Sequence, residues 1–338
     1  MPATAQEPSL AIVLGASMGG VEALLTLAAA LPDDVPAIFC IVLHVGSHQS
    51  ILPELLRARG KARAMHAVDG QRAEPGTLYV APPDHHLLLE GDVLRLSRGP
   101  RENLARPAID PLFRSAAVHW RERAIGVVLT GRLDDGAAGL AAIKAAGGKA
   151  VVQNPAEAPE PEMPLAALDA TAVDACLPLA DIAPYLVQLA QVAGSAAPAP
   201  VPAAIRDEHA INLGDLSMER LDSIGDVSTL TCPECGGTLW EMRDAKPLRY
   251  RCHTGHAFSA GSLAHGQEQL VNSHIWGGAR SLRERAMLLR RMQAVATGTD
   301  DPRQAAAIRA QADRVTRQAE TLEAMLLEDA VEADEGSA

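Results

Sequence analysis

Short apolar runs alternate along the first half of the chain with stretches in which apolar residues recur every three or four positions. The runs have the length of buried strands, and the periodic stretches have the spacing of amphipathic helices. The expected strands are Ala11–Leu14, Ile38–Leu43, Leu78–Val80, Ile125–Leu129, Ala150–Val152 and Ala172–Leu177. The expected helices cover about 20–31, 50–59, 110–120, 136–147 and 181–192. This order predicts an α/β fold, doubly wound around a mostly parallel sheet.

A different pattern interrupts this alternation between residues 86 and 98. Two short apolar runs there flank the turn Glu90-Gly91-Asp92, which is typical of a β-hairpin. We therefore expect one α/β domain over residues 8–192, with a hairpin inserted into it.

The composition changes after residue 192. Small residues and prolines dominate the next stretch, so we expect a linker over 193–228 and predict no firm structure for 205–228. A cysteine-containing module follows over 229–260. Two periodic stretches separated by the turn-forming residues 296–302 then predict a helical hairpin over 261–330.

Charge and hydropathy exclude several classes of protein. The formal net charge of -12 over 338 residues argues against a nucleic-acid-binding protein. No apolar run reaches membrane-spanning length, and the amino terminus lacks the features of a signal peptide. We expect no membrane insertion and a cytoplasmic location, which also fits five cysteines with a single C-x-x-C pair.

A glycine-rich turn follows the first expected strand and contains Ser17 between Gly15 and Gly19-Gly20. Free N–H groups at the start of the next helix can stabilise an oxyanion beside this serine, and the glycines allow a sharp bend. Two other roles remain open. The turn could bind phosphate, although it matches neither nucleotide-binding fingerprint, or Ser17 could cap the helix.

Other polar residues also stand directly after expected strands. His44 follows the second strand, and Asp134 and Asp135 follow the strand that begins at Ile125. Parallel strands end at one edge of a sheet, where ligands bind. Since a serine hydroxyl is not ionised near neutral pH, it needs a base, and a carboxylate can orient that base. The pattern predicts a Ser-His-Asp site at this edge.

Five motifs in the first domain resemble, in the same order, those of CheB-type chemotaxis methylesterases. They are Gly15-Ala-Ser-Met-Gly-Gly20, Leu43-His44, Gly76-Thr-Leu-Tyr-Val-Ala-Pro82, Arg106-Pro-Ala-Ile-Asp110-Pro-Leu-Phe-Arg-Ser115 and Val128-Leu-Thr-Gly-Arg-Leu-Asp-Asp-Gly-Ala-Ala-Gly139. The resemblance implies hydrolysis of glutamate γ-methyl esters on the cytoplasmic domain of chemoreceptors or a related signalling protein. Some family members also deamidate receptor glutamines.

Carried over by motif, the resemblance implies Ser17 as nucleophile, His44 as general base and Asp135 as the third member. Asp135 is the aspartate directly before the glycine, while its neighbour Asp134 could cap the following helix. We expect no receiver domain within this chain, because only about ten residues precede the first strand.

The chain departs from the usual family residues at several places, which are Met18, Val45-Gly46, Arg132-Leu133 and Leu165. Backbone donors survive such changes, so an oxyanion hole near Met18 and Arg132 is still expected. A catalytically weak signalling or receptor-binding protein on the same fold is the alternative. A nucleotide-binding domain is a more distant one.

The cysteine-containing module has the spacing of a zinc site. Cys232-x2-Cys235, sixteen residues, and Cys252-x3-His256 suit one tetrahedral ion in a zinc-ribbon-like module. A redox C-x-x-C and a ligand role for His253 are the alternatives. We expect one structural zinc, no cofactor for catalysis, and unfolding of the module alone when the metal is removed.

The two remaining cysteines stand outside this module. Cys40 and Cys176 lie in apolar runs, so we expect both to be inert core residues.

Overall fold

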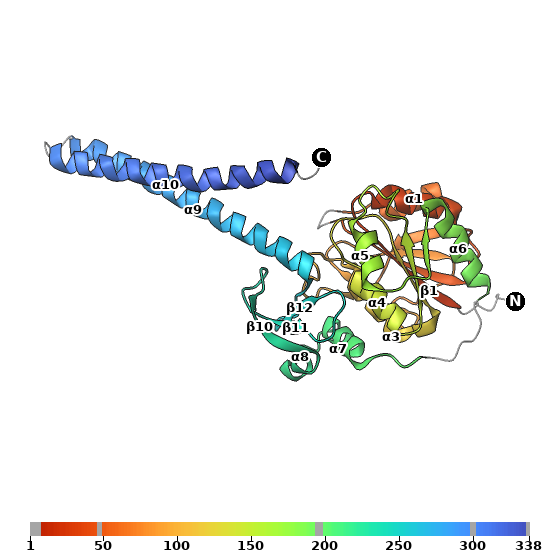
Figure 1. Ribbon diagram of the computed structural model, residues 1–338. Helices are drawn as coiled ribbons and strands as arrows, with labels where there is room; N and C mark the ends of the chain where they lie inside the picture. The colour runs from red at the N-terminus through yellow and green to blue at the C-terminus, as the bar shows by residue number, and fades with distance from the viewer. Residues whose placement is uncertain (1–7, 46–48, 193–198, 298–301, 336–338) are drawn as a thin grey trace. The chain divides into compact units, whose positions relative to one another are not determined.

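A computed structural model describes residues 8–45, 49–192, 199–297 and 302–335 (Figure 1). Part of the expected linker, 193–198, and part of the expected turn, 298–301, lie outside these residues. The chain forms two compact units, divided after Leu263.

The first unit contains a parallel sheet with the order β3-β4-β2-β1-β7-β8-β9. Its strands are β1 (Leu10–Ala16), β2 (Ala37–Leu43), β3 (Arg63–His66), β4 (Thr77–Val80), β7 (Ala124–Val128), β8 (Lys149–Gln153) and β9 (Ala175–Leu177). The chain runs outward from β1 on both sides, because β1 pairs with β2 and with β7. Ligands in such folds bind at the carboxyl edge of the sheet, at the point where the chain reverses its direction, which here is β1.

Helices cover both faces of this sheet (Figure 1). One face packs against α1 (Gly20–Ala30), α2 (Leu52–Arg59) and α6 (Leu179–Gln191), and the other against α3 (Ile109–His119), α4 (Ala137–Ala145) and α5 (Glu162–Ala170). Successive strand residues alternate between the two cores, since β-strand side chains point to opposite faces. The predicted doubly wound α/β fold is confirmed.

The inserted hairpin is also present, formed by β5 (His86–Glu90) and β6 (Val93–Ser97). Leu87 and Leu89 of β5 are fully buried in the same core as α3. A short 3-10 turn, Arg121–Arg123, then connects α3 to β7.

Two elements of the α/β domain were not predicted, and one cysteine was misplaced. The strand β3 is too short and polar for a recognisable apolar run, and α5 contains Pro164 in its first turn. The expected strand at 172–177 begins only at Ala175 and forms the edge of the sheet. Cys176 is therefore exposed rather than in the core, whereas Cys40 is buried as expected.

The rest of the first unit is a small antiparallel sheet, here called the ribbon sheet (residues 225–259). Its strands are β10 (Gly225–Thr231), β11 (Thr238–Met242), β12 (Arg249–Cys252) and β13 (Ala257–Ser259). Two helices precede it, α7 (Ala203–Asn212) and α8 (Met218–Ile224). They occupy most of the stretch for which no structure was predicted, and α7 buries the charged residue Glu208 by contacts with distant segments.

The second unit is an antiparallel pair of long helices, α9 (Ala260–Thr297), which begins in the first unit, and α10 (Pro302–Glu335). Ala286 and Leu289 of α9 pack with Ala312 and Val315 of α10. Figure 1 shows the two helices side by side, as expected for a helical hairpin. Among the described residues, no helix is both long and apolar enough to cross a membrane.

Candidate active site

Ser17, His44 and Asp135 meet at the carboxyl edge of the sheet. Ser17 follows β1 directly, His44 follows β2 directly, and Asp135 lies in the loop after β7. The His44 Nδ1 atom lies 3.2 Å from Ser17 Oγ, and the His44 Nε2 atom lies 2.8 Å from Asp135 Oδ2. The loops after β1, β2 and β7 therefore bring together a hydroxyl, an imidazole and a carboxylate, with the imidazole within hydrogen-bonding distance of both other groups.

The charge of Asp135 determines where His44 carries its proton. An ionised carboxylate can only accept, so His44 Nε2 bears the hydrogen and donates it to Asp135. The Nδ1 atom of the neutral ring then has a lone pair that faces Ser17 Oγ. This tautomer is the one that can take the serine proton.

Asp135 is buried but well supplied with hydrogen-bond donors. Its Oδ2 atom accepts from the backbone N–H of Ile109 at 2.6 Å, and its Oδ1 atom from Asn103 Nδ2 at 2.9 Å. Burial alone would raise the pKa of Asp135, but the hydrogen bonds and charge of His44, with these further donors, hold the pKa below its ordinary value. Asp135 is therefore ionised at neutral pH.

Asp110, in the first turn of α3, accepts hydrogen bonds from the start of α4, and Asp135, just before α4, accepts them from the start of α3. The Asp110 Oδ1 atom accepts the N–H groups of Gly136 at 3.1 Å and Gly139 at 2.6 Å, while Asp135 receives the N–H groups at the start of α3. Burial and the nearby Asp135 carboxylate raise the pKa of Asp110 to about 7. The two carboxyl groups thus differ in acidity, and the charge stays on the one that faces His44.

The structure contradicts the capping roles considered for Ser17 and Asp134. The N-cap residues of α1 and α4 are Gly19 and Gly136, which have left-handed backbones and no side chain that could cap the helix. Ser17 Oγ faces His44, and Asp134 Oδ1 instead accepts the hydroxyl of Ser259 at 2.6 Å.

Backbone contacts fix the loops around Ser17. The Ser17 N–H donates to Thr130 O at 3.0 Å, and the Thr130 hydroxyl lies 3.0 Å from Met18 O. A Cβ on Gly131 would lie 2.8 Å from the Ser17 Cβ and 2.0 Å from Met163 Sδ, so only glycine fits there. Ser17 is therefore held by tight backbone packing.

Some of the residues that depart from the usual family pattern have exposed side chains. The side chains of Met18 and Arg132 are exposed, and Arg132 lies 3.8 Å from Glu162. Within the described part of the chain, no group accepts the backbone N–H of Met18. That N–H is available as an oxyanion donor whatever side chain stands there. Gly46, another departure, lies outside the described residues.

A second cluster lies in the ribbon sheet and has the composition of a metal centre. One ligand atom from each of Cys232, Cys235, Cys252 and His256 lies within 4.8 Å of the others. The Cys235 and Cys252 Sγ atoms are 3.9 Å apart, and the Cys252 Sγ and His256 Nδ1 atoms 3.5 Å apart. Sulfur ligands about 2.3 Å from one tetrahedral zinc lie about 3.8 Å from each other. The donor set and its spacing therefore fit a zinc ion.

Sequence reasoning missed the residues that connect these two places. Asn103 touches Asp135 and Asp110 on one side, and Ser259 and Ser262 on the other. No pattern in the sequence marks Asn103, because its partners lie up to 159 positions away.

A serine, a histidine and a buried aspartate in hydrogen-bonded order at the switch point of a parallel sheet are the arrangement expected of an α/β serine hydrolase. The family model of CheB methylesterase matches residues 12–186 of this chain. The chain therefore belongs to the CheB methylesterase family.

Two curated relatives and one solved structure resemble this chain. A putative protein-glutamate methylesterase/protein-glutamine glutaminase of Leptospira interrogans is 41% identical over 187 residues, covering 54% of this chain and 95% of the relative. Protein-glutamate methylesterase/protein-glutamine glutaminase 4 of Anaeromyxobacter dehalogenans is 40% identical over 195 residues, covering 54% of this chain and 52% of the relative. The crystal structure of the Thermotoga maritima CheB methylesterase catalytic domain has a TM-score of 0.52 and 29% identity, covering 53% of this chain and 98% of that one.

Proposed function

We propose that this protein is a protein-glutamate methylesterase that hydrolyses glutamate γ-methyl esters on the cytoplasmic domain of a methylated chemoreceptor. The observation that carries the proposal is the hydrogen-bonded chain from Ser17 Oγ through His44 to Asp135 Oδ2. Family membership and the names of the relatives support the ester as substrate. The cytoplasm is the compartment that such a substrate implies.

The first half-reaction forms an ester between the substrate and Ser17. Ser17 Oγ attacks the ester carbonyl carbon while its proton passes to His44 Nδ1. Asp135 stabilises the positive ring through Nε2. The tetrahedral intermediate then expels the methoxy group, which takes the proton from His44 and leaves as methanol.

The second half-reaction uses the same groups with water as the nucleophile. His44 Nδ1 takes a proton from water, and the resulting hydroxide attacks the acyl carbon on Ser17. Collapse of this intermediate breaks the Ser17 ester, returns the proton to Oγ and releases the glutamate γ-carboxylate. A glutamine amide would follow the same path with ammonia as the leaving group, which agrees with the paired names of the relatives.

The negative oxygen of each intermediate needs donors beside Ser17. The backbone N–H of Met18, at the start of the turn into α1, is free among the described residues. Loss of one such donor typically costs a hundred- to a thousand-fold in rate, about 3 to 4 kcal/mol. Since this donor belongs to the backbone, the departure at Met18 leaves it in place.

The ribbon sheet would hold one zinc through Cys232, Cys235, Cys252 and His256. Four protein ligands leave no open position, so the ion would supply structural stability and take no part in the ester chemistry. Nothing in the reaction described above needs a cofactor.

The direct test is methanol release from methylated chemoreceptor cytoplasmic fragments. We expect release by the wild-type protein, complete loss in Ser17→Ala, and unchanged release in the control Ser223→Ala, which alters an exposed serine of α8. Absence of release by the wild type, while Ser17 still reacts with a fluorophosphonate, would keep the hydrolase but reject this substrate. Absence of both would favour a binding protein on the same fold.

A further inference from the structure

The loop that precedes α3 lies between the ribbon sheet and the triad. Its residue Glu102 forms a parallel bridge with Ala257 of β13. The Asn103 N–H donates to Ala257 O at 2.8 Å, and the Ala257 N–H donates to Arg101 O at 3.3 Å. These bonds add the loop to the edge of the ribbon sheet as an extra strand.

The Asn103 side chain continues this link to the triad acid. Its Nδ2 group donates to Asp135 Oδ1 at 2.9 Å and to Asp110 Oδ2 at 3.0 Å. Its Oδ1 atom accepts from the Ser259 N–H and the Ser262 hydroxyl, both at 2.9 Å. The partners fix the orientation of this amide, because a backbone N–H can only donate and an ionised carboxylate can only accept.

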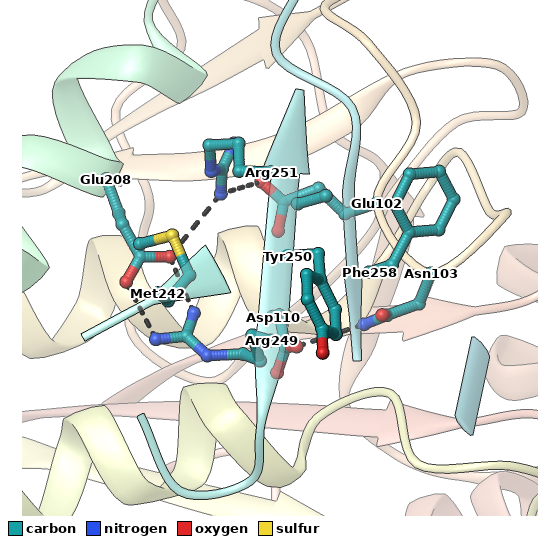
Figure 2. A pocket seen from close by; sticks show the side chains of 10 residues that line it. Glu102, Asn103, Asp110, Glu208, Met242, Arg249, Tyr250, Arg251 and Phe258 are labelled. Carbon is teal, nitrogen blue, oxygen red and sulfur yellow. Dashed lines mark hydrogen bonds and ion pairs between the residues drawn. The ribbon is translucent and has the colours of Figure 1, made fainter. Parts of the chain in front are cut away.

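A buried network of charges holds the ribbon sheet against the α/β domain (Figure 2). Arg251 of β12 donates to Glu102 at 2.8 Å, and Arg114 of α3 donates to Glu102 at 2.5 Å. Glu208 of α7 accepts from Arg249 at 2.6 Å and lies 3.1 Å from Arg114. All but Arg249 are almost completely buried, so each charge depends on its partners.

The space between these groups is filled by side chains. The cavity that Figure 2 shows measures about 10 Å³ and is lined by Asn103, Asp110, Arg249 and Arg251 among others. Pockets for small molecules measure about 300 Å³ or more, so this contact is a joint between two parts and not a ligand site.

The cluster of Cys232, Cys235, Cys252 and His256 is connected to this contact through β12 and β13. Cys252 ends β12, one residue after Arg251, and His256 directly precedes β13, which carries Ser259. The turn between the two strands is closed by the Cys252 N–H, which donates to His256 O at 2.8 Å. An ion bound to Cys252 and His256 would fix this turn, and with it the position of β13.

We propose that Asn103 is a positioning residue for Asp135 and that the ribbon sheet, closed by its metal, holds Asn103 in place. Assembly of the ribbon sheet thereby sets the geometry of the triad and the rate of the esterase. The inference rests on the proposed function only for the identity of the substrate, since the positioning concerns Asp135 itself.

The test compares the zinc-loaded, full-length protein with the variants Asn103→Ala and Ser262→Ala. Ser281→Ala is the matched control, because its hydroxyl donates to Gly277 O within α9 and not to Asn103. For each protein we measure kcat and KM of methanol release and the rate at which a fluorophosphonate labels Ser17.

A second readout follows hydrogen exchange at the N–H groups of Ile109 and Asp110, which donate to Asp135. The rate of exchange at these groups reports whether their hydrogen bonds to the Asp135 carboxylate persist, and the measurement needs no substrate. Loss of a residue that holds a catalytic group in place can cost about 100-fold in rate. In Asn103→Ala we expect kcat and the labelling rate to fall by about that factor, with KM unchanged and faster exchange at both groups.

Ser262, at the start of α9, supplies one of the two hydrogen bonds that the Asn103 Oδ1 atom accepts, so we expect Ser262→Ala to cause a smaller loss in the same direction. Removal of zinc by a chelator is expected to lower the labelling rate and to speed exchange at Ile109 and Asp110. The control Ser281→Ala keeps wild-type values for all of these.

Unchanged labelling and exchange in both variants would overturn the proposal. So would a metal-free protein that has lost the ribbon sheet, by circular dichroism, while labelling and exchange stay at wild-type values. If Asn103→Ala does not fold, Ser262→Ala decides. Failure of the wild type to release methanol would reject the proposed substrate, while labelling of Ser17 and exchange would still test the role of Asn103.

Discussion

The seven-stranded sheet is packed against its helices by apolar side chains, whereas the ribbon sheet meets the same domain through buried charges. Alternate residues of β1, such as Ile12 and Val13, enter two separate apolar cores. At the other contact, Arg114 and Arg251 both converge on Glu102. In an apolar core, the loss in the free energy of unfolding grows with the number of atoms removed. In a buried ion pair, removal of one partner leaves an unpaired charge, which lowers the free energy of unfolding strongly. We therefore expect the ribbon contact to be more sensitive than the apolar cores to pH and to substitution of its charged residues.

The largest loss of activity is expected on substitution of Asp135. This residue contacts His44 on one side and Asn103, in the loop that joins the ribbon sheet, on the other. In Asp135→Asn an amide donor would face His44 Nε2, so the ring proton would move to Nδ1 and the base for Ser17 would be lost. We expect kcat for methanol release to fall by about 10⁴-fold, with the far-ultraviolet circular dichroism unchanged. Asp134→Asn is the control, because Asp134 bonds Ser259 and should show a much smaller loss.

Replacement of a charge at the ribbon contact should cost the most stability. Arg114→Met would leave the carboxylates of Glu102 and Glu208 without one of their guanidinium partners. We expect the free energy of unfolding in urea to fall by about 3 to 5 kcal/mol. Arg72→Met, which removes an exposed ion pair with Asp92, should cost less than about 1 kcal/mol. Equal losses in the two variants would show that the buried charges of the ribbon contact contribute no more to stability than an exposed ion pair does.

Acid should weaken the ribbon contact before it affects the apolar cores. Burial alone would raise the pKa of Glu208, but the charges of Arg249 and Arg114 hold it at about 2. Because this pKa is lower in the folded protein than the ordinary value of about 4.5, the stabilisation is complete above that value. It is lost as the pH falls from about 4.5 toward 2.

Urea unfolding at a series of pH values checks this prediction. The variant Glu208→Gln should be less stable than the wild type at neutral pH and should lose less stability on acidification. A variant with the full acid dependence of the wild type would show that Glu208 is not its source.

A conservative change in the apolar core should have a smaller effect that does not depend on pH. Ile143 is fully buried between α4 and the sheet. Ile143→Val should cost about 0.5 to 1.5 kcal/mol in urea unfolding, equally at pH 4 and pH 7. If the loss in the free energy of unfolding differed between the two pH values, the apolar core and the charged ribbon contact would be energetically coupled, contrary to this prediction.

The smallest effect is expected at the exposed residues that depart from the family pattern. The Arg132 side chain is exposed, and its pair with Glu162 at 3.8 Å is at the surface, where such pairs contribute little. Arg132→Ala should leave fluorophosphonate labelling of Ser17 near the wild-type rate. A large loss would give this side chain a direct part in the site.

The parts of the molecule that could be predicted are those in which neighbouring residues carry the information. Ser17 and His44 each follow a continuous apolar strand directly, so their place at the sheet edge was predictable from the order of elements. The spacing of Cys232 and Cys235 likewise indicated a ligand pair. Asp134 and Asp135 both follow β7, and only the family motif favours Asp135.

The rest depended on contacts between distant segments. Glu102 and Arg114 look like surface charges in the sequence, yet they are buried because β12 and α7 supply their partners. Helix α7 has no clear apolar stripe for the same reason, since its buried face includes Glu208 and Asn212. Asn103 stands in no local sequence pattern, so its contact with Asp135 becomes visible only in the structure.

The most direct test of the triad is site-resolved covalent labelling, because it needs no knowledge of the substrate. The full-length protein is treated with a fluorophosphonate, and the modified peptide is identified by mass spectrometry in the wild type and in His44→Ala. A working triad predicts a single modified site at Ser17 in the wild type and loss of that modification in His44→Ala. Labelling of another residue, or equal labelling of Ser17 in both proteins, would contradict the assignment of Ser17 and His44 as nucleophile and base.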